Sequence, residues 1–301
     1  MSYTIRFAAI AACLTLCSIG VAQNPSSPND PAAVLNQQNL VAWCIVPFDA
    51  ARRSPAERAT MLKELGITRC AYDWRAEHVA SFEQEILEYK KHGIDFFAFW
   101  GGHPDAFRLF QKHDIHPQIW QMIGEPSGDN QAAKVEAAAQ QWLALAKQTG
   151  SMDCKLSLYN HGGWGGEPYN LAAVCARLHE LGQTHVGIVY NFHHGHDHIA
   201  DWAESLKLML PYLHCLNLNG MNDAAQPKIL GIGKGAHELN MIKQIIASGY
   251  SGPIGILDHR NELDSRDSLL ENLQGVQWVT REVRQPGTGG PLPADPVAFA
   301  P

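Results

Sequence analysis

The sequence predicts a single-domain (β/α)8 TIM barrel, and its alternating pattern carries this prediction. Between residues 39 and 284, eight short apolar runs bounded by turn residues alternate with eight amphipathic stretches of helical period. No linker-like segment interrupts the alternation. A doubly wound open sheet is the alternative, but that fold normally has fewer repeats and a glycine-rich first turn, which this sequence lacks.

The expected strands are apolar throughout, as parallel strands covered on both faces are. They are 40–48, 67–74, 95–101, 116–123, 154–161, 185–192, 213–220 and 252–259. Two of the expected helices have clear start signals. Ser54 with Glu57, and Ser81 with Gln84, have the spacing of a capping box at a helix N-terminus.

The first 22 residues form a pattern typical of a secretory signal peptide. Arg6 precedes an apolar run that is too short to span a bilayer comfortably, and small residues follow up to Ala22. We therefore expect the mature chain to begin after Ala22 and to be exported, either periplasmic or extracellular. A lipoprotein anchored through Cys13 or Cys17 is the alternative.

Two further segments lie outside the predicted barrel. Residues 23–38 are polar and carry prolines, which is typical of a linker. Residues 285–301 are rich in proline and glycine and have no apolar periodicity, so we expect a disordered tail. The barrel domain is therefore expected to cover residues 39–284.

Charge and cysteine content limit the function classes. The formal net charge of −7 argues against nucleic acid or an anionic membrane surface as the main partner. Five cysteines follow the signal peptide, an odd number with wide spacing, so we expect buried thiols rather than a disulfide framework. The oligomeric state stays open.

Polar and aromatic residues gather where the predicted strands end, and in a barrel these ends form the catalytic face. The densest stretch is "YNFHHGHDH" at residues 190–198, which follows the sixth strand. Such side chains suit carbohydrate, which offers hydroxyl groups for hydrogen bonds and C–H faces for stacking. The expected sugar-binding residues are Trp43, Trp74, Arg75, Trp100, Asn160, Trp164, Glu167, Asn191, His196, Asn217, Asn219 and Lys234.

Three carboxylates at these strand ends are candidates for a catalytic base, namely Glu125, Asp73 and Glu167. Glu125 ranks first because it follows the fourth strand directly, whereas Glu167 lies beyond a flexible glycine run. The alternative for either glutamate is a purely structural role at a helix N-terminus, where carboxylates are favoured.

The histidines of residues 190–198 should not be equivalent. Strand alternation points Asn191 toward the barrel axis, and His194 can turn back over the same site as a catalytic group. His196 lies further out and could reach a bound sugar. His198 opens the next helix and should serve structure. A solvated loop or an adventitious metal chelator is the alternative for the whole stretch.

Three strand ends resemble those of the xylose-isomerase-like sugar isomerase/epimerase barrels. The fifth strand, "LSLYNHGG", resembles their Glu-Asn-His segment, and the sixth, "VGIVYNFHHGH", resembles their Asp-Thr-x-His segment. The run "GYSGPIGILDH" is similar to their final Gly-Tyr-x-Gly strand, and the resemblance covers residues 40–280. It implies proton abstraction beside a sugar carbonyl, assisted by one divalent metal bound at the ends of strands five to eight.

The metal positions of that family are altered in this chain, where they are Tyr159, Asn191, Asn217 and Leu257. No carboxylate ligand is retained there unless Asp258 supplies one at the eighth strand. Histidines could replace the usual ligands, and the candidates are His161, His194 and His259. Neutral imidazoles favour a borderline metal over Mg, so Zn, Mn or Ni is the candidate cofactor.

These observations favour an exported enzyme similar to sugar isomerases and epimerases. It would remove a proton next to a carbonyl of a non-phosphorylated sugar or an oxidised glycoside, and elimination by a lyase is an adjacent outcome of the same chemistry. The alternative is a non-catalytic carbohydrate-binding barrel that has lost the family's metal site.

Overall fold

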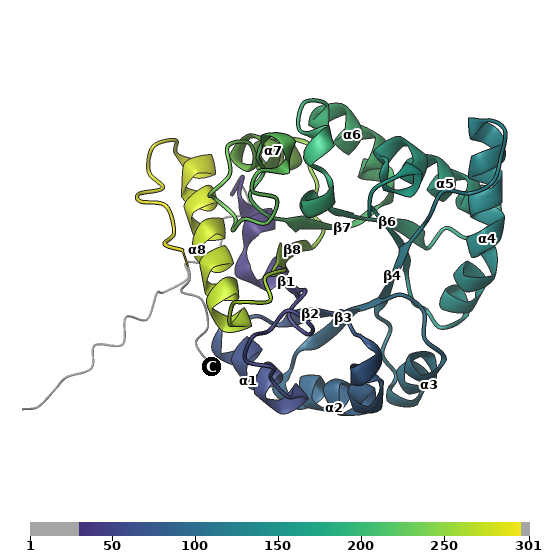
Figure 1. The fold of residues 1–301 in the computed structure, drawn as a ribbon, viewed down its shortest axis with the longest axis horizontal. Coiled ribbons are helices and arrows are strands. Elements are labelled where there is room, and N and C mark those ends of the chain that lie inside the picture. The colour runs from purple at the N-terminus through teal and green to yellow at the C-terminus, as the bar shows by residue number, and fades with distance from the viewer. Residues whose placement is uncertain (1–29, 296–301) are drawn as a thin grey trace, which may run out of the picture.

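The computed structural model describes residues 30–295, which form a closed barrel of eight parallel strands (Figure 1). Each strand pairs with its neighbours in sequence, and β8 closes the ring against β1. The predicted (β/α)8 barrel is therefore confirmed. The strands are β1 (Leu40–Trp43), β2 (Arg69–Tyr72), β3 (Asp95–Trp100), β4 (Gln118–Met122), β5 (Leu156–Tyr159), β6 (Val186–Asn191), β7 (Leu213–Leu218) and β8 (Ile254–Leu257).

A helix follows each strand and packs on the outside of the ring (Figure 1). These helices are α1 (Pro55–Glu64), α2 (Phe82–His92), α3 (Pro104–His113), α4 (Gln131–Ser151), α5 (Pro168–Glu180), α6 (Trp202–Met209), α7 (Glu238–Ala247) and α8 (Ser265–Arg284). The strands are buried on both faces because side chains alternate between the helices outside and the axis inside. The inner face forms a core of its own, which includes Val41, Ala71, Ala98, Val189 and Cys215.

One of the two expected capping boxes is present. Glu57 accepts a hydrogen bond from the Ser54 backbone N–H at 2.9 Å, and the Ser54 side chain accepts one from the Glu57 N–H. The prediction of the second capping box, at Ser81, is wrong, because a 3-10 helix, η3 (Ala76–Ser81), runs directly into α2. The Ser81 hydroxyl donates to the His78 carbonyl instead and caps nothing in α2.

Both segments next to the barrel are more closely attached than expected. Within the expected linker 23–38, Ala32 and Leu35 are buried and two short 3-10 helices lead into β1. In the expected tail, the Trp278 indole N–H donates to the Gly290 carbonyl, and the Gly289 N–H donates to Glu282. Backbone groups of the tail thus fold back on α8, a contact that apolar periodicity does not reveal. The expected signal peptide lies outside the described residues.

The cysteines of the described residues agree with the expectation of buried thiols. Their five thiols are all free and buried, and they belong to Cys44, Cys70, Cys154, Cys175 and Cys215. None of the helices in residues 30–295 combines the length and apolarity needed to cross a lipid bilayer.

Candidate active site

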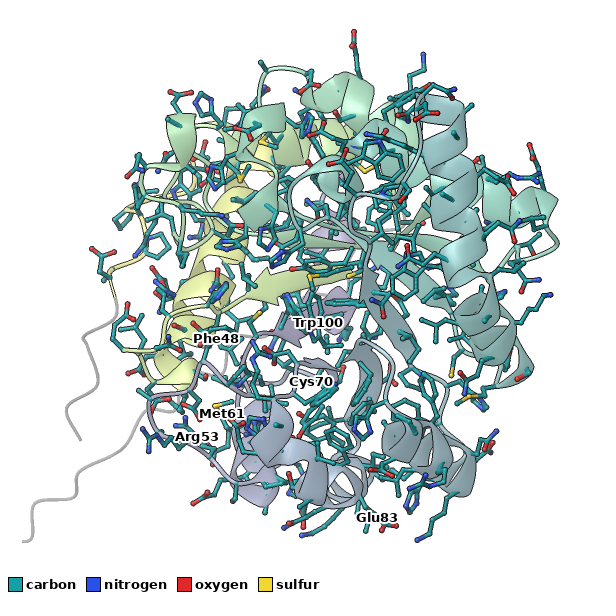
Figure 2. All side chains as sticks on the ribbon, turned by 45° about the vertical axis from the view of Figure 1, so that its right-hand side comes forward. Phe48, Arg53, Met61, Cys70, Glu83 and Trp100 are labelled. Carbon is teal, nitrogen blue, oxygen red and sulfur yellow. The ribbon has the colours of Figure 1, made fainter. Side chains whose placement is uncertain are left out.

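An aromatic floor closes the barrel at the carboxyl ends of its strands. It consists of Trp43, Trp100, Trp120 and Tyr159. Trp43 meets Trp120 edge to face with ring centroids 4.7 Å apart, and Trp100 meets Tyr159 at the same distance. Such edge-to-face pairs are favourable, so the floor is a rigid, packed layer rather than a channel. Figure 2 shows Trp100 near the middle of the molecule, with Phe48 and Arg53 to its left.

Four histidine rings form a line in space beside this floor, each in contact with the next, and we call them the histidine row. Its members, in order of contact, are His161, His194, His193 and His259. Successive ring centroids are 4.3, 4.5 and 4.8 Å apart. Tyr159 touches both His161 and His194, and Phe48 extends the row past His259 with centroids 4.0 Å apart. Side chains from β5, β6, β8 and the β1–α1 loop therefore meet at one mouth.

The local sequence explains how β6 delivers two of these rings. Asn191 ends the strand, and its side-chain oxygen accepts a hydrogen bond from the His193 N–H at 3.0 Å. This cap starts a single 3-10 turn, η5 (Phe192–His194), which turns the chain over the mouth. Among the described residues, the ring nitrogens of His193 and His194 have no hydrogen-bond partner.

The histidine row is neutral at physiological pH. Burial, with smaller contributions from neighbouring rings and the Lys228 ammonium, lowers the pKa of His193 to about 3 and that of His194 to about 2. Burial also lowers the pKa of His161 and His259. Neutral imidazoles can each donate one hydrogen bond and accept another, which suits the hydroxyl and carbonyl groups of a sugar.

Asp73 is the carboxylate that the structure places beside this mouth. It follows β2, and alternation from Ala71 in the inner core points it to the axis side. Its side chain is buried, Oδ1 accepts a hydrogen bond from the Val46 N–H at 3.4 Å, and Oδ2 has no partner. Burial raises the pKa of Asp73 to about 7. A carboxyl group with that pKa can gain and lose a proton near neutral pH.

The positions that would hold the family's metal are filled by packed side chains. Tyr159 and Leu257 are 2 % and 4 % exposed and belong to the inner core. The Asn191 amide donates to the Tyr159 hydroxyl, and Asn217 is buried against Cys215, whose Sγ donates to its Oδ1 at 3.5 Å. Asp258 lies against Ser265 and Ser268 at the start of α8, where burial raises its pKa to about 8. This donor set does not fit a divalent metal.

The three histidines expected to replace the metal ligands do not converge on one point. His161 and His194 are neighbours, but His259 packs on His193 and Phe48. Within residues 30–295, no group of three or more His, Cys, Asp or Glu side chains is arranged to hold a metal ion. His161, His194 and His259 are spread along the row because they follow three different strands, β5, β6 and β8.

Three expected site residues are instead held in ion pairs away from the row. Glu125 binds the Lys134 ammonium with 2.5 Å between Oε1 and Nζ, and Glu167 lies 3.2 Å from His198. Lys234 is nearly buried between Glu271 and Asp295. Sequence position alone cannot separate a carboxylate at the rim from one at the axis, and the ranking of Glu125 above Asp73 rested on position alone.

The expected tryptophans divide into two sets. Trp43 and Trp100 belong to the aromatic floor, and Trp100 is partly accessible. Trp74 packs outside the ring on Phe99, and its indole N–H donates to the Trp100 carbonyl at 2.7 Å. Trp164 donates to Gln131 at the rim. Of these tryptophans, Trp100 is the one whose ring contacts the histidine row within residues 30–295, with 6.5 Å between its centroid and that of His161.

Three expected polar ligands are engaged within the protein. Asn160 holds β6 through two hydrogen bonds, accepting from the Asn191 N–H and donating to the Asn191 carbonyl. Asn219 donates to the Gly220 carbonyl, although its Oδ1 is buried without a partner. His196 is 3.0 and 3.2 Å from the carbonyls of Asn222 and Lys228 and so anchors the β7–α7 loop. His198 contacts Asp201 at 3.2 Å, as expected for a structural role.

Three residues at the mouth were missed by sequence reasoning, namely Phe48, His193 and Lys228. His193 stood in the quoted histidine stretch, which was its only signal. Beside the mouth lies a groove of about 1080 Å³. Its lining includes Val46, whose N–H holds Asp73, together with residues of the β1–α1 loop, Glu77 and His78 of η3, and two residues of the β8–α8 loop. The β1–α1 residues are Pro47, Asp49, Ala50, Arg52 and Arg53, and the β8–α8 residues are Asn261 and Glu262. The groove is large enough for a small oligosaccharide.

Comparison with known proteins shows which structures share this fold. No family model matches the sequence, and no curated protein does either. The chain is similar to 3-keto-D-glucoside 4-epimerase, YcjR, from E. coli, with a TM-score of 0.60 and 13% identity over 80% of this chain and 98% of that one. The fold is that of the xylose isomerase-like TIM barrels.

Two other solved structures support the same fold. A xylose isomerase domain containing protein from Salmonella typhimurium LT2 has a TM-score of 0.61 at 10% identity, over 80% of this chain and 98% of that one. The IolI protein, whose structure holds a zinc atom, has a TM-score of 0.59 at 11% identity, over 81% and 97%. The resemblance seen in the three strand ends is therefore confirmed at the level of fold.

Proposed function

We propose that this chain is an exported, isomerase- or epimerase-like enzyme that acts on a non-phosphorylated sugar at the barrel mouth. The observation that supports it best is Asp73, a buried carboxyl group with a free Oδ2 and a pKa of about 7 at the axis side of the mouth. The neutral imidazoles of the histidine row supply hydrogen-bond donors at the same mouth. The structural neighbours include a sugar epimerase.

In the proposed reaction, the Asp73 carboxylate takes a proton from the carbon next to a sugar carbonyl. The electron pair of the broken C–H bond forms an enolate, and an imidazole N–H of His193 or His194 donates to its oxygen. In isomerisation a proton is delivered to the neighbouring carbon, while the hydroxyl proton passes from one oxygen of the enediol to the other. In epimerisation a proton from water reaches the opposite face of the same carbon, and Asp73 releases the proton it took to water. Elimination follows if the next carbon carries a glycosidic oxygen. No step passes through a metal.

A carbohydrate-binding barrel without catalysis is the second candidate. It is favoured by Tyr159 and Leu257, which fill the family's metal position with packed side chains. The two candidates differ in one measurable property, because only the enzyme makes a sugar C–H bond exchange with solvent.

Solvent exchange tests the proposal directly. In D2O, proton NMR should show loss of the signal next to the carbonyl of at least one aldose or ketose in a panel. Asp73→Asn should lower the exchange rate by roughly 10²–10⁴-fold, as loss of a general base does. Glu136→Gln, on the α4 side that pairs with Arg177 of α5, should not change the rate. The wild-type rate should rise as pH increases through about 7, where the Asp73 carboxyl ionises.

Two results would contradict the proposed catalytic function or its assignment to Asp73. Sugar binding without exchange would leave the binding barrel as the function. Loss of exchange in Glu125→Gln, with Asp73→Asn unaffected, would move the base to the fourth strand. Export is tested separately by N-terminal sequencing, which should find a start near Gln23 rather than Met1 or a lipidated Cys13.

A further inference from the structure

One basic side chain stands at the β8 end of the histidine row. The Arg75 guanidinium carbon lies 5.5 Å from the centroid of the Phe48 ring, which itself packs on His259. Its Nη1 donates to the Trp74 carbonyl at 2.8 Å, which fixes the side chain. Within residues 30–295, no carboxylate forms an ion pair with Arg75, so its remaining N–H groups face solvent at the mouth.

A second basic side chain approaches from the β7–α7 loop. His196 contacts the carbonyls of Asn222 and Lys228, so the backbone that carries Lys228 is anchored to the turn after β6. Beyond the larger effect of burial, the Lys228 ammonium lowers the pKa of all four rings of the histidine row. Arg75 also lowers the pKa of His259. Both cations therefore act on the same ring.

Within residues 30–295, no carboxylate forms an ion pair with either Arg75 or Lys228. The charged side chains that act on His161 and His259 are all basic, although the whole chain has a net charge of −7. Arg75 acts on the buried carboxyl of Asp73 and lowers its pKa, but the larger effect of burial raises that pKa to about 7, so Asp73 carries only part of a negative charge at neutral pH. The mouth is thus a local site of positive charge on an acidic protein.

We propose that the sugar recognised at this mouth carries a carboxylate, as uronic and aldonic acids do, and that Arg75 and Lys228 bind it. This inference rests on the proposed function and names its substrate class. Guanidinium binds carboxylate with two parallel hydrogen bonds, and ammonium adds a point charge. The neutral histidines and Trp100 then face the uncharged part of the sugar.

The same two cations would assist the proposed chemistry. Removing the proton beside a carboxylate places a second negative charge on the carboxylate oxygens, and fixed cations at those oxygens stabilise it. The proton goes to the base, and the electron pair of the C–H bond goes into the new C=C bond. Charge stabilisation would therefore come from Arg75 and Lys228, at a site where Tyr159 and Leu257 occupy the family's metal position.

Matched sugar pairs test the proposal. Isothermal titration at low salt should compare glucuronate with glucose, galacturonate with galactose, and mannuronate with mannose. We expect at least one acid to bind 10-fold or more tightly than its neutral partner, with a preference that weakens as salt is raised. Lys228→Glu and Arg75→Ala should each reduce that preference at least fivefold. Lys207→Ala, an exposed lysine on α6, is the matched control and should leave it unchanged.

The outcomes separate this proposal from the proposed function. Equal affinity for acids and neutral sugars, with solvent exchange intact, would overturn the proposal of a carboxylate-bearing substrate and leave the proposed enzymatic function standing. A preference that survives both substitutions would overturn the assignment to Arg75 and Lys228. Absence of binding to every sugar, together with absence of exchange, would overturn both.

Discussion

Two regions of the barrel contain buried histidines whose pKa is lowered in the same direction, yet their surroundings differ. Near the amino ends of the strands, His214 lies 2.9 Å from the Ser157 hydroxyl, which donates to Gln118 Oε1 at 3.1 Å. The Trp120 indole N–H donates to the same oxygen at 3.0 Å. Burial lowers the pKa of His214 to about 3. At the mouth, by contrast, the rings of His193 and His194 meet other rings and have no hydrogen-bond partner in residues 30–295.

The difference teaches that a shifted pKa does not by itself mark a functional histidine. Because the Ser157 proton goes to Gln118, His214 must donate its Nδ1–H to Ser157, and the network is complete. Gly187 leaves room for this ring, since a Cβ there would lie 2.4 Å from His214 Nε2. We therefore assign His214 to structure and the histidine row to ligand binding.

The largest expected effect is a loss of stability when the hydrogen-bond network of His214, Ser157 and Gln118 is broken. His214→Ala should lower the free energy of unfolding by about 2–3 kcal/mol, because it leaves a cavity and removes the hydrogen bond from His214 to the Ser157 oxygen. Urea unfolding measures this change, and sugar binding by the refolded variant should be intact. A loss below about 1 kcal/mol would show that the network is not a structural element.

The second expectation concerns pH. The folded pKa of His214 lies below that of the unfolded chain, so its contribution to stability is present above pH 6.5 and is lost as pH falls toward 3. His214→Gln should remove up to about 1.4 kcal/mol per pH unit from the slope of stability in that window. Unfolding curves at pH 7, 6 and 5 measure it. An unchanged slope would mean that His214 titrates normally in the folded protein.

At the mouth, we expect substitution of a histidine to weaken sugar binding rather than stability. His194→Ala should weaken sugar binding at least 10-fold, or about 1.4 kcal/mol, and change the free energy of unfolding by less than that. The reason is that its ring makes no hydrogen bond that folding requires. Calorimetry and urea unfolding of the same sample decide the matter, and a stability loss as large as that of His214→Ala would remove the contrast between the two regions.

The smallest effect is expected at His198. Its ring contacts Asp201 and Glu167, both of them exposed, so His198→Ala should cost at most about 1 kcal/mol of stability and spare binding. Loss of binding in this variant, with His194→Ala behaving like wild type, would reverse our placement of the loop after β6.

Much of this architecture could be predicted from the sequence, because local signals carry it. Continuous apolar runs specify buried parallel strands, and capping residues and glycines mark where helices begin and end. The location of "YNFHHGHDH" after β6, and the placement of His194 at the mouth, followed from strand order and alternation alone. The altered metal positions were also visible, since Tyr159 and Leu257 cannot supply carboxylates.

Tertiary structure decided which strand-end residues meet. Glu125 ranked above Asp73 from its position in the sequence, yet Glu125 pairs with Lys134 at the rim and Asp73 is buried beside the axis. Lys228 had no local signal, because the loop that carries it is anchored by His196 from another strand. Local patterns determine the secondary structure and its order, whereas burial, ion pairing and charge at the mouth depend on contacts between residues far apart in the chain.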